Sequence, residues 1–553
     1  MPEQDFAARA PVVVVGGGPV GLALALLLDA QNVACVVYDE GDASFDHPRG
    51  NTHNARTMEH YRRLGIADPI RALGLPEHQA TDVVYFTRYS GYELARLPMP
   101  SGTQKRKAVA SAPADGQVPE PLHRANQMYV ERFLVRHART RPNITLRYGV
   151  RVDEILPDAD GVTVRDHRGR RTRARYVVGC DGGRSLVRRS AGIEYTGEHT
   201  LDQDVLGRKA TAAYLRLPTL RRDLLGGRDA WSYWAVNADV VVNLISLDGA
   251  DEFCLLTSSL DPDTFDAEQL VRIVRSAAGT DLPVEVLGHR AWKPGVALVA
   301  GSFGSGRVFL AGDAAHLFTP TGGFGMNTGI DDVANLAWKL AAGTRGWGGA
   351  RLLESYSAER RPVALRNTAA ARALNQNLGA IERPAALEDD SAAGRSARAA
   401  AAALLGTLGE QFSSIGVQLG ARYDGSPVIR AEDADTPPPD SLTTYTPSGV
   451  PGGRAPHLWL DGGRGAGSSL YDRLGAGFTL LRLGASPPDG AALCAAAADR
   501  GVPLTVLDVP GPVGRELYGR DLALVRPDQH LAWRGDRLPR DAVRLLAQVT
   551  GAG

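Results

Sequence analysis

The chain has 553 residues, 44% of them hydrophobic, and its 62 basic residues balance 62 acidic ones. This length suits about three domains with large cores, and the balanced charge excludes the basic bias typical of nucleic-acid binding or an anionic membrane surface. The N-terminal ten residues are polar and no apolar run approaches the roughly 18 residues of a membrane span, so we expect neither a signal peptide nor a membrane segment. Four scattered cysteines without metal-ligand spacing predict a cytoplasmic protein without a structural metal.

The pattern of strands and helices changes along the chain. β-branched runs alternate with helical runs up to about residue 365, a loop-rich stretch (98–121) interrupts them, and a strand-rich stretch follows later, which indicates an α/β architecture with an inserted sheet. Proline, glycine and small polar residues then mark a linker. We predict a discontinuous main domain (1–207 and 293–365, with part of the substrate region near 80–120), an inserted sheet (208–292), a helical segment (366–430), a linker (431–453) and a small α/β domain (454–553).

The first motif is a glycine-rich turn between a buried strand and a helix. A run of four valines reads as the strand, and Gly16, Gly18 and Gly21 follow with the spacing G-x-G-x-x-G. These glycines permit a tight turn, close approach of the backbone to a pyrophosphate, and close packing of helix on strand. A second strand ends at Asp39, and either this carboxylate or that of Glu40 can accept hydrogen bonds from ribose hydroxyls. The order of elements predicts dinucleotide binding rather than a glycine turn without function.

The second motif is a strand that ends at Asp181-Gly182 and leads into an arginine-rich helical stretch. Arg184 and Arg188 belong to this stretch. For the arginines alone, a solvated helix face is a fair competing interpretation. A G-x-G-x-x-G turn for a second nucleotide is absent from the sequence.

The third motif is a strand that ends at Gly312-Asp313, followed by a loop and by Gly322-Gly323 at the start of a long helix. An acid at a strand end beside a glycine can hold a polyol hydroxyl. The exposed N–H groups of a glycine-rich helix start can stabilise negative charge. We interpret His316, in the loop, as packing or hydrogen-bonding rather than as an acid–base catalyst.

The three motifs in this order resemble those of the single-component FAD-dependent aromatic hydroxylases of the para-hydroxybenzoate and phenol hydroxylase type. PRGNTHNARTMEHYRRLGI, RANQMYVERFLVRHA and LLESYSAERRPVA carry the same resemblance, which covers essentially the whole chain. The implied fold is a Rossmann-like FAD-binding domain with an inserted β-sheet substrate domain, a helical segment and a C-terminal thioredoxin-like α/β domain, as in the longer members. This last domain has a single cysteine, which excludes a dithiol redox role.

The resemblance implies non-covalent FAD, NADPH or NADH as a transient reductant, and O2 as co-substrate. The first motif would bind the ADP half of FAD, and Asp313 the ribityl chain. Asp181-Gly182 would touch FAD and contribute to NADPH recognition, with help from Arg184 or Arg188. The expected FAD contacts are Gly16, Gly18, Pro19, Val20, Gly21, Asp39, Glu40, Arg49, Gln127, Asp181, Gly182, Gly312, Asp313, Gly325, Met326 and Asn327.

The implied reaction is hydroxylation of a phenolic or polycyclic, polyketide-like aromatic through a flavin C4a-hydroperoxide. Such a site must exclude water, and Pro320, Gly322 and Gly323 would frame it.

The catalytic base is the point at which the sequence departs from part of the family. Members of the phenol hydroxylase type carry an acid five residues before the arginine that matches Arg56, and here that position is Asn51, which cannot act as a base. His53 is a nearby candidate, although packing is the favoured interpretation. The base could also come from the inserted sheet or from water, or be unneeded for an acidic substrate.

We expect the substrate, a small aromatic molecule, to lie between the flavin and the inserted sheet. Residues 231–234 (WSYW), Asn243 and the pair His289-Arg290 are candidate wall residues, although an ordinary sheet core is the commoner role. No arginine can be singled out as a carboxylate clamp.

Two further functions stay open. Baeyer–Villiger insertion or epoxidation would use the same motifs, and a non-catalytic FAD-binding interaction protein is a candidate of another class. We expect no nucleic-acid or membrane partner, a monomer or a homodimer, and a C-terminal domain whose deletion (440–553) leaves a flavin-binding core.

Overall fold

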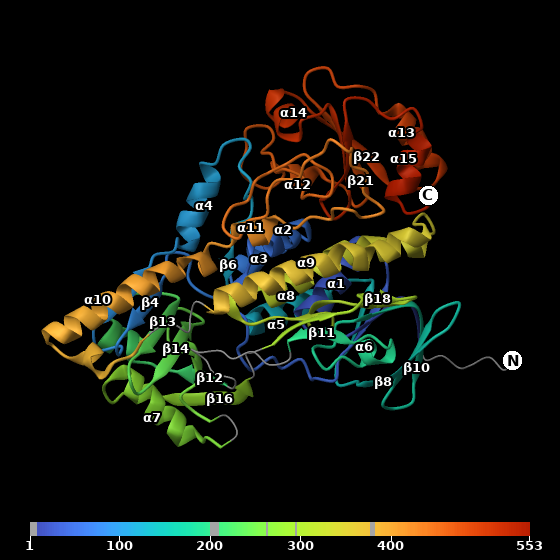
Figure 1. Ribbon diagram of the computed structural model, residues 1–553. Helices are drawn as coiled ribbons and strands as arrows, with labels where there is room; N and C mark the ends of the chain where they lie inside the picture. Colours follow the sequence, from blue (N-terminus) through green and yellow to red (C-terminus); the bar gives the residue numbers. More distant parts are fainter. Residues whose placement is uncertain (1–7, 199–209, 262–263, 293–295, 377–381) are drawn as a thin grey trace.

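The computed structural model describes residues 8–198, 210–261, 264–292, 296–376 and 382–553. The expectations for the N-terminal segment and for the start of the inserted sheet at residue 208 lie outside these residues. Figure 1 shows a mixed α/β molecule in which the inserted sheet (green) and the C-terminal domain (red) lie at opposite sides of two long central helices, α8 and α9. Among the described residues, the structure contains no helix long and apolar enough to cross a membrane.

The core of the main sheet contains buried hydrophobic runs, such as residues 12–15 and Val308–Leu310, because helices cover its faces. Its central strands are parallel, in the order β19-β10-β1-β2-β7, and β18 extends it antiparallel beside β19. A β8–β9 hairpin joins it through β10. The strands are β1 (Ala8–Val15), β2 (Cys35–Tyr38), β7 (Ile144–Arg147), β8 (Val152–Pro157), β9 (Val162–Asp166), β10 (Arg171–Gly179), β18 (Gly304–Ser305) and β19 (Val308–Leu310).

Helices surround this sheet, and α1 packs on both α5 and α8. The run of small and aliphatic residues after the glycine turn makes α1 buried along almost its whole length. The helices of this part are α1 (Pro19–Ala30), α2 (Ala55–Arg63), α3 (Ala67–Arg71), α5 (Gln127–Ala138), α6 (Leu186–Ser190), α8 (Phe324–Arg345) and α9 (Ala350–Gln376). Short strands complete it: β3 (Thr52–His53), β6 (His123–Arg124), β11 (Tyr195–Glu198), β17 (Ala297–Ala300) and β20 (His316–Leu317).

The inserted sheet has seven strands in the order β16-β12-β15-β14-β13-β4-β5. Because side chains alternate along a strand, one face packs under α7 (Ala267–Ala278) and the other faces the main domain. Val84 and Phe86, for example, join the α7 side, whereas Val83 and Tyr85 join the other. The strands are β4 (Val83–Phe86), β5 (Glu93–Leu97), β12 (Ala210–Arg216), β13 (Ser232–Val236), β14 (Val241–Ser246), β15 (Glu252–Thr257) and β16 (Glu285–Trp292).

The stretch 98–121, expected to be loop-rich, contains a helix, α4 (Gly102–Ala110). None of the residues of α4 is buried, so its sequence lacks the apolar periodicity by which an amphipathic helix is predicted. Ser101 and Gln104 form a reciprocal capping box at its start, and this pair in the sequence could have indicated the helix.

The remaining helices lead to the C-terminal domain. α10 (Ala392–Gly406) packs on β5, and α11 (Ile415–Leu419) packs on α2, while the predicted linker has no helix or regular strand. The C-terminal sheet has the order β22-β21-β23-β24, as expected for the small α/β domain. Its elements are α12 (Leu470–Arg473), β21 (Phe478–Leu483), α13 (Ala491–Asp499), β22 (Leu504–Val509), α14 (Pro512–Tyr518), β23 (Leu522–Val525), β24 (Leu531–Gly535) and α15 (Ala542–Val549).

The C-terminal domain shares an apolar core with the central helices. Trp338 of α8 lies in one apolar cluster with Phe478 of β21, at a ring-centroid distance of 5.7 Å. Two ion pairs also join the domain to the central helices: Arg454 pairs with Glu59 of α2, and Arg526 pairs with Glu359 of α9 at 2.6 Å. The side chains of all four residues are buried. Deletion of the domain would therefore leave two buried carboxylates without these partners.

Candidate active site

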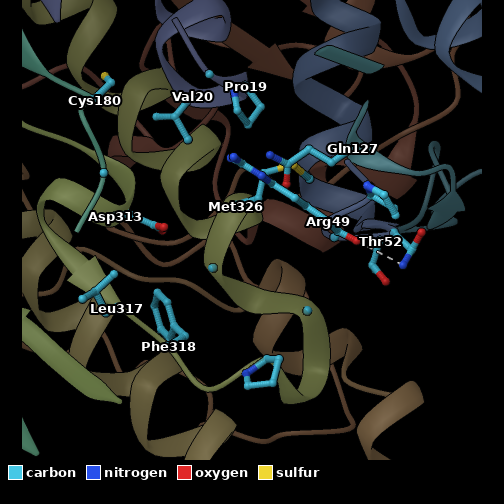
Figure 2. Close-up of a pocket in the computed structure, with 18 of the residues that line it drawn as sticks. Pro19, Val20, Arg49, Thr52, Gln127, Cys180, Asp313, Leu317, Phe318 and Met326 are labelled. Carbon is cyan, nitrogen blue, oxygen red and sulfur yellow. Dashed lines mark hydrogen bonds between the residues drawn. The ribbon is translucent and has the colours of Figure 1, made fainter. Parts of the chain in front are cut away.

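A cavity of about 1070 Å³ lies between the strand ends of the main sheet and the inserted sheet. The carboxyl ends of β1, β10 and β19 meet at one edge, because the three strands are parallel neighbours. Figure 2 shows Pro19, Arg49, Asp313 and Met326 around this space, on four separate segments of the chain. The volume slightly exceeds the roughly 300 to 1,000 Å³ of ordinary small-molecule pockets, so there is room for more than one ligand.

The glycine turn after β1 has no space for side chains where the chain is tightest. A Cβ on Gly16, which has a φ of +107°, would lie 2.2 Å from the carbonyl oxygen of Cys180. A Cβ on Gly21 would lie 1.9 Å from the carbonyl oxygen of Gly16. At Gly18 the nearest atom would be 3.9 Å away, and as the residue before α1 it leaves the helix start open. This cradle fits a pyrophosphate on the N–H groups of α1.

Asp39 is fixed at the end of β2 by two backbone groups. Its carboxylate accepts hydrogen bonds from the N–H of Gly17 at 2.6 Å and of Gly41 at 2.7 Å. Asp39 and Glu40 both line the cavity beside the glycine turn. The position suits a ribose next to the pyrophosphate cradle.

Arg49 and Gln127 lie across the pocket from Asp313 and Leu317 (Figure 2). The N–H of Gln127 donates to the carbonyl oxygen of Gly50 at 2.7 Å, and its side-chain amide donates to Glu131 at 2.9 Å. Burial raises the pKa of the Glu131 carboxyl. These contacts join the start of α5 to the segment that carries Arg49.

Asp313 lines the cavity just after β19, and burial raises the pKa of its carboxyl. Gly312, with a φ of +60°, turns the chain there and packs against Val20. His316 is fully buried outside the cavity lining, and its Nε2 lies 2.6 Å from Asp332, which Arg360 also binds at 2.8 Å. His316 therefore packs and pairs, as its sequence context indicates.

Asp181 also reaches the cavity, and its Oδ2 accepts the N–H of Val187 at 3.1 Å. Of the two arginines expected to help a nicotinamide nucleotide, Arg184 lines the cavity. Arg188 instead lies over the ring of Tyr195, 3.7 Å from the centroid, and donates to a backbone carbonyl.

The loop before α8 turns sharply through glycines. Gly322 and Gly323 have φ values of +81° and +65°, and Gly323 gives α8 no side-chain cap. Asn327 lies behind this loop rather than in the cavity lining: its Nδ2 donates to the carbonyl of Thr52 at 2.9 Å, and its Oδ1 accepts the N–H of Asn54 at 2.9 Å. Asn327 thus ties the start of α8 to the segment 52–54.

Asn51 lines the cavity, and its Oδ1 accepts a hydrogen bond from Asn126 at 2.7 Å. His53 does not line it. The imidazole is completely buried, with its ring centroid 5.8 Å from that of Tyr61, and burial lowers its pKa to about 4. We therefore drop His53 as a candidate base, because a neutral ring sealed in the core offers no proton path to the cavity.

Most of the other expected cofactor residues line the same cavity, whereas Gly21 and Gly312 act by letting neighbouring segments pack closely. The expected residues in the lining are Gly16, Gly18, Pro19, Val20, Asp39, Glu40, Arg49, Asn51, Gln127, Asp181, Gly182, Asp313, Pro320, Gly322, Gly323, Gly325 and Met326.

The inserted sheet contributes the opposite wall through its face away from α7. Of the candidate wall residues, Trp231, Trp234, Asn243 and Arg290 line the cavity, whereas His289 packs on Phe265. Sequence reasoning missed the following wall residues, which adjoin the cavity only through tertiary packing: Arg124, Phe318, Phe412 and Ser414.

Three comparisons with known proteins agree with this geometry. A family model described as FAD binding domain matches residues 9–371, and one described as aromatic-ring hydroxylase, C-terminal, matches residues 448–552. The FAD-dependent monooxygenase apdD of Emericella nidulans is 32% identical, covering 98% of this chain and 90% of that one. Tetracenomycin A2 monooxygenase-dioxygenase of Streptomyces glaucescens is 31% identical, covering 98% and 97%. The rebeccamycin biosynthetic enzyme RebC with reduced flavin superposes with a TM-score of 0.86 at 37% identity, covering 99% of each chain.

Proposed function

Because this chain belongs to the FAD-dependent monooxygenases of the aromatic-ring hydroxylase family, we propose that it hydroxylates a polycyclic phenolic substrate in the cavity between the two sheets. The observation that carries the proposal is the cavity itself, which joins a dinucleotide cradle to a wall with two tryptophans. A flat aromatic molecule would lie between that wall and the start of α8.

FAD bound in this cavity would take electrons from NAD(P)H and supply an activated oxygen atom from O2. The N–H groups at the start of α1 would hold its pyrophosphate, and Asp39 its adenosine ribose. Asp313 would hold the ribityl chain, while Arg49 and Gln127 would close over the opposite side.

The loop before α8 would position the reacting end. The uncapped N–H groups behind Gly323 form the positive end of a 22-residue helix, which suits the negative charge of a reduced flavin ring. Pro320 and Gly322 lie in the same cavity wall, where they would keep water from the reacting oxygen. Asn327 would act indirectly, by holding this loop against Thr52.

A test is substrate-dependent oxidation of NADPH by the FAD-loaded protein, followed by structure determination of the product by NMR. The panel contains simple phenols and tricyclic and tetracyclic phenols. Faster NADPH oxidation with a polycyclic phenol, and a new ring hydroxyl in the product, would support the proposal. An oxygen inserted into a ring bond would indicate Baeyer–Villiger chemistry instead. NADPH oxidation that no phenol accelerates would contradict the hydroxylation proposal.

A further inference from the structure

Arg124, on β6, is a buried cation in the cavity wall whose charge no carboxylate balances in the described part of the chain. Its side chain lines the cavity, yet the residue is only 5% exposed. One guanidinium nitrogen donates to the hydroxyl of Thr52, and Nε has no acceptor. Its Cζ lies 3.7 Å from the ring centroid of Trp231. Arg124 is held in place by a hydroxyl and a ring, and neither neutralises it.

Two arginines buried elsewhere in the protein are paired with carboxylates. Arg360 pairs with Asp331 and Asp332, and Arg526 pairs with Glu359 at 2.6 Å. A buried charge without such a partner is costly, and burial alone lowers the pKa of Arg124 to about 9. Strongly perturbed buried charges cluster at binding and catalytic sites, and Arg124 lies in the wall of such a cavity.

Arg124 lies where a ring above the start of α8 would meet it. Thr52, its hydrogen-bond partner, is next to Gly323, since a Cβ on that glycine would come within 3.2 Å of Thr52. On the other side, Trp231 also contacts Phe412 edge-to-face, with centroids 6.3 Å apart. Arg124 therefore joins the proposed reacting end of the cavity to its aromatic wall.

We propose that Arg124 binds an anionic oxygen of the aromatic substrate, either a carboxylate on the ring system or an ionised phenol. This rests on the proposed function, because it assigns a role within the same cavity. A cation favours the ionised form of a nearby phenol, which becomes more nucleophilic. Such a contact would make a general base unnecessary at the position where the chain has Asn51. Arg124 is thus a substrate-positioning residue.

The experiment measures binding of three matched probes to the FAD holoenzyme by the change in flavin absorbance: naphthalene, 1-naphthol and 1-naphthoate. Wild-type protein should bind at least one oxygen-bearing probe more than ten-fold more tightly than naphthalene. A preference for naphthoate identifies a carboxylate, and tight naphthol binding that strengthens as pH rises identifies a phenolate. Binding of all three with equal Kd, or no binding, would overturn the proposal without requiring any variant to fold.

Variants assign the effect to this residue. Arg124→Met keeps the apolar stem over Trp231 and should weaken the preferred anionic probe about ten-fold or more while changing the Kd for naphthalene less than two-fold. Arg124→Lys should recover part of the loss. Arg136→Met, which removes an exposed arginine of α5 outside the cavity lining, is the matched control and should retain the preference. An unchanged preference in the FAD-loaded Arg124→Met protein would overturn the assignment. Because no turnover is needed, failure of the hydroxylase proposal would be seen separately.

Discussion

Arg454→Met tests how strongly the C-terminal domain is tied to the flavin-binding body. Nη2 of Arg454 lies 2.5 Å from Oε1 of Glu59, and its Nε lies 3.1 Å from Oε2. Glu59 is fully buried, and within the described part of the chain its one other cationic partner is Arg56, at 2.8 Å. Breaking a buried pair typically costs about 3–5 kcal/mol. Because Arg56 remains, we expect a loss near the lower end, about 3 kcal/mol.

The assay is urea unfolding at pH 7, followed by tryptophan fluorescence and by release of flavin. The double variant Arg454→Met/Glu59→Gln removes both charges and should recover part of the loss. Arg473→Met removes an exposed pair with Asp461 at 3.4 Å, and should cost less than about 1 kcal/mol. If Arg454→Met were as stable as Arg473→Met, the buried pair would not hold the domains as argued.

Three further predictions follow from particular side chains. Asp313→Ala should lose bound FAD, whereas Asp313→Asn should retain more of it; an Asp313→Ala protein with a full complement of flavin and full activity would exclude a ribityl contact. Burial lowers the pKa of His53 to about 4, below the roughly 6.5 of the unfolded chain, so its contribution to stability is complete above pH 6.5 and declines as pH falls towards 4. Between pH 7 and pH 5, the free energy of unfolding of His53→Leu should therefore fall by about 2 kcal/mol less than that of wild type, as measured by urea unfolding. If both proteins lost the same free energy of unfolding over this range, a neutral buried ring would be refuted. Deletion of residues 440–553 should give insoluble or flavin-free protein, because Glu59 and Glu359 lose partners; a soluble yellow core would show that these pairs are dispensable.

The dinucleotide cradle could be predicted from the sequence because its requirements are local. Gly16 and Gly21 sit within one strand–turn–helix unit, and each is needed where a Cβ would strike nearby backbone. The place of Asp313 beside the cavity could be predicted for the same reason, since it lies three residues after a short buried strand.

The cavity wall and the interdomain contacts could not be predicted in this way. The role proposed for Arg124 rests on Trp231, more than a hundred residues along the chain, and on the lack of a carboxylate partner among the residues that the structure describes. Glu59 and Arg454 lie 395 positions apart, and no pattern around either residue indicates the other. Helix α4 was missed because a helix without buried residues shows no apolar period.

The central claim is that the cavity transfers one oxygen atom from O2 to an aromatic ring. The most direct measurement is turnover of the FAD-loaded protein with NADPH, a polycyclic phenol and oxygen-18 gas, with product mass read by mass spectrometry. The account predicts one labelled oxygen atom in the aromatic product. A hydroxylated product without the oxygen-18 label, or NADPH consumed with hydrogen peroxide as the sole product across the panel of polycyclic phenols, would contradict it.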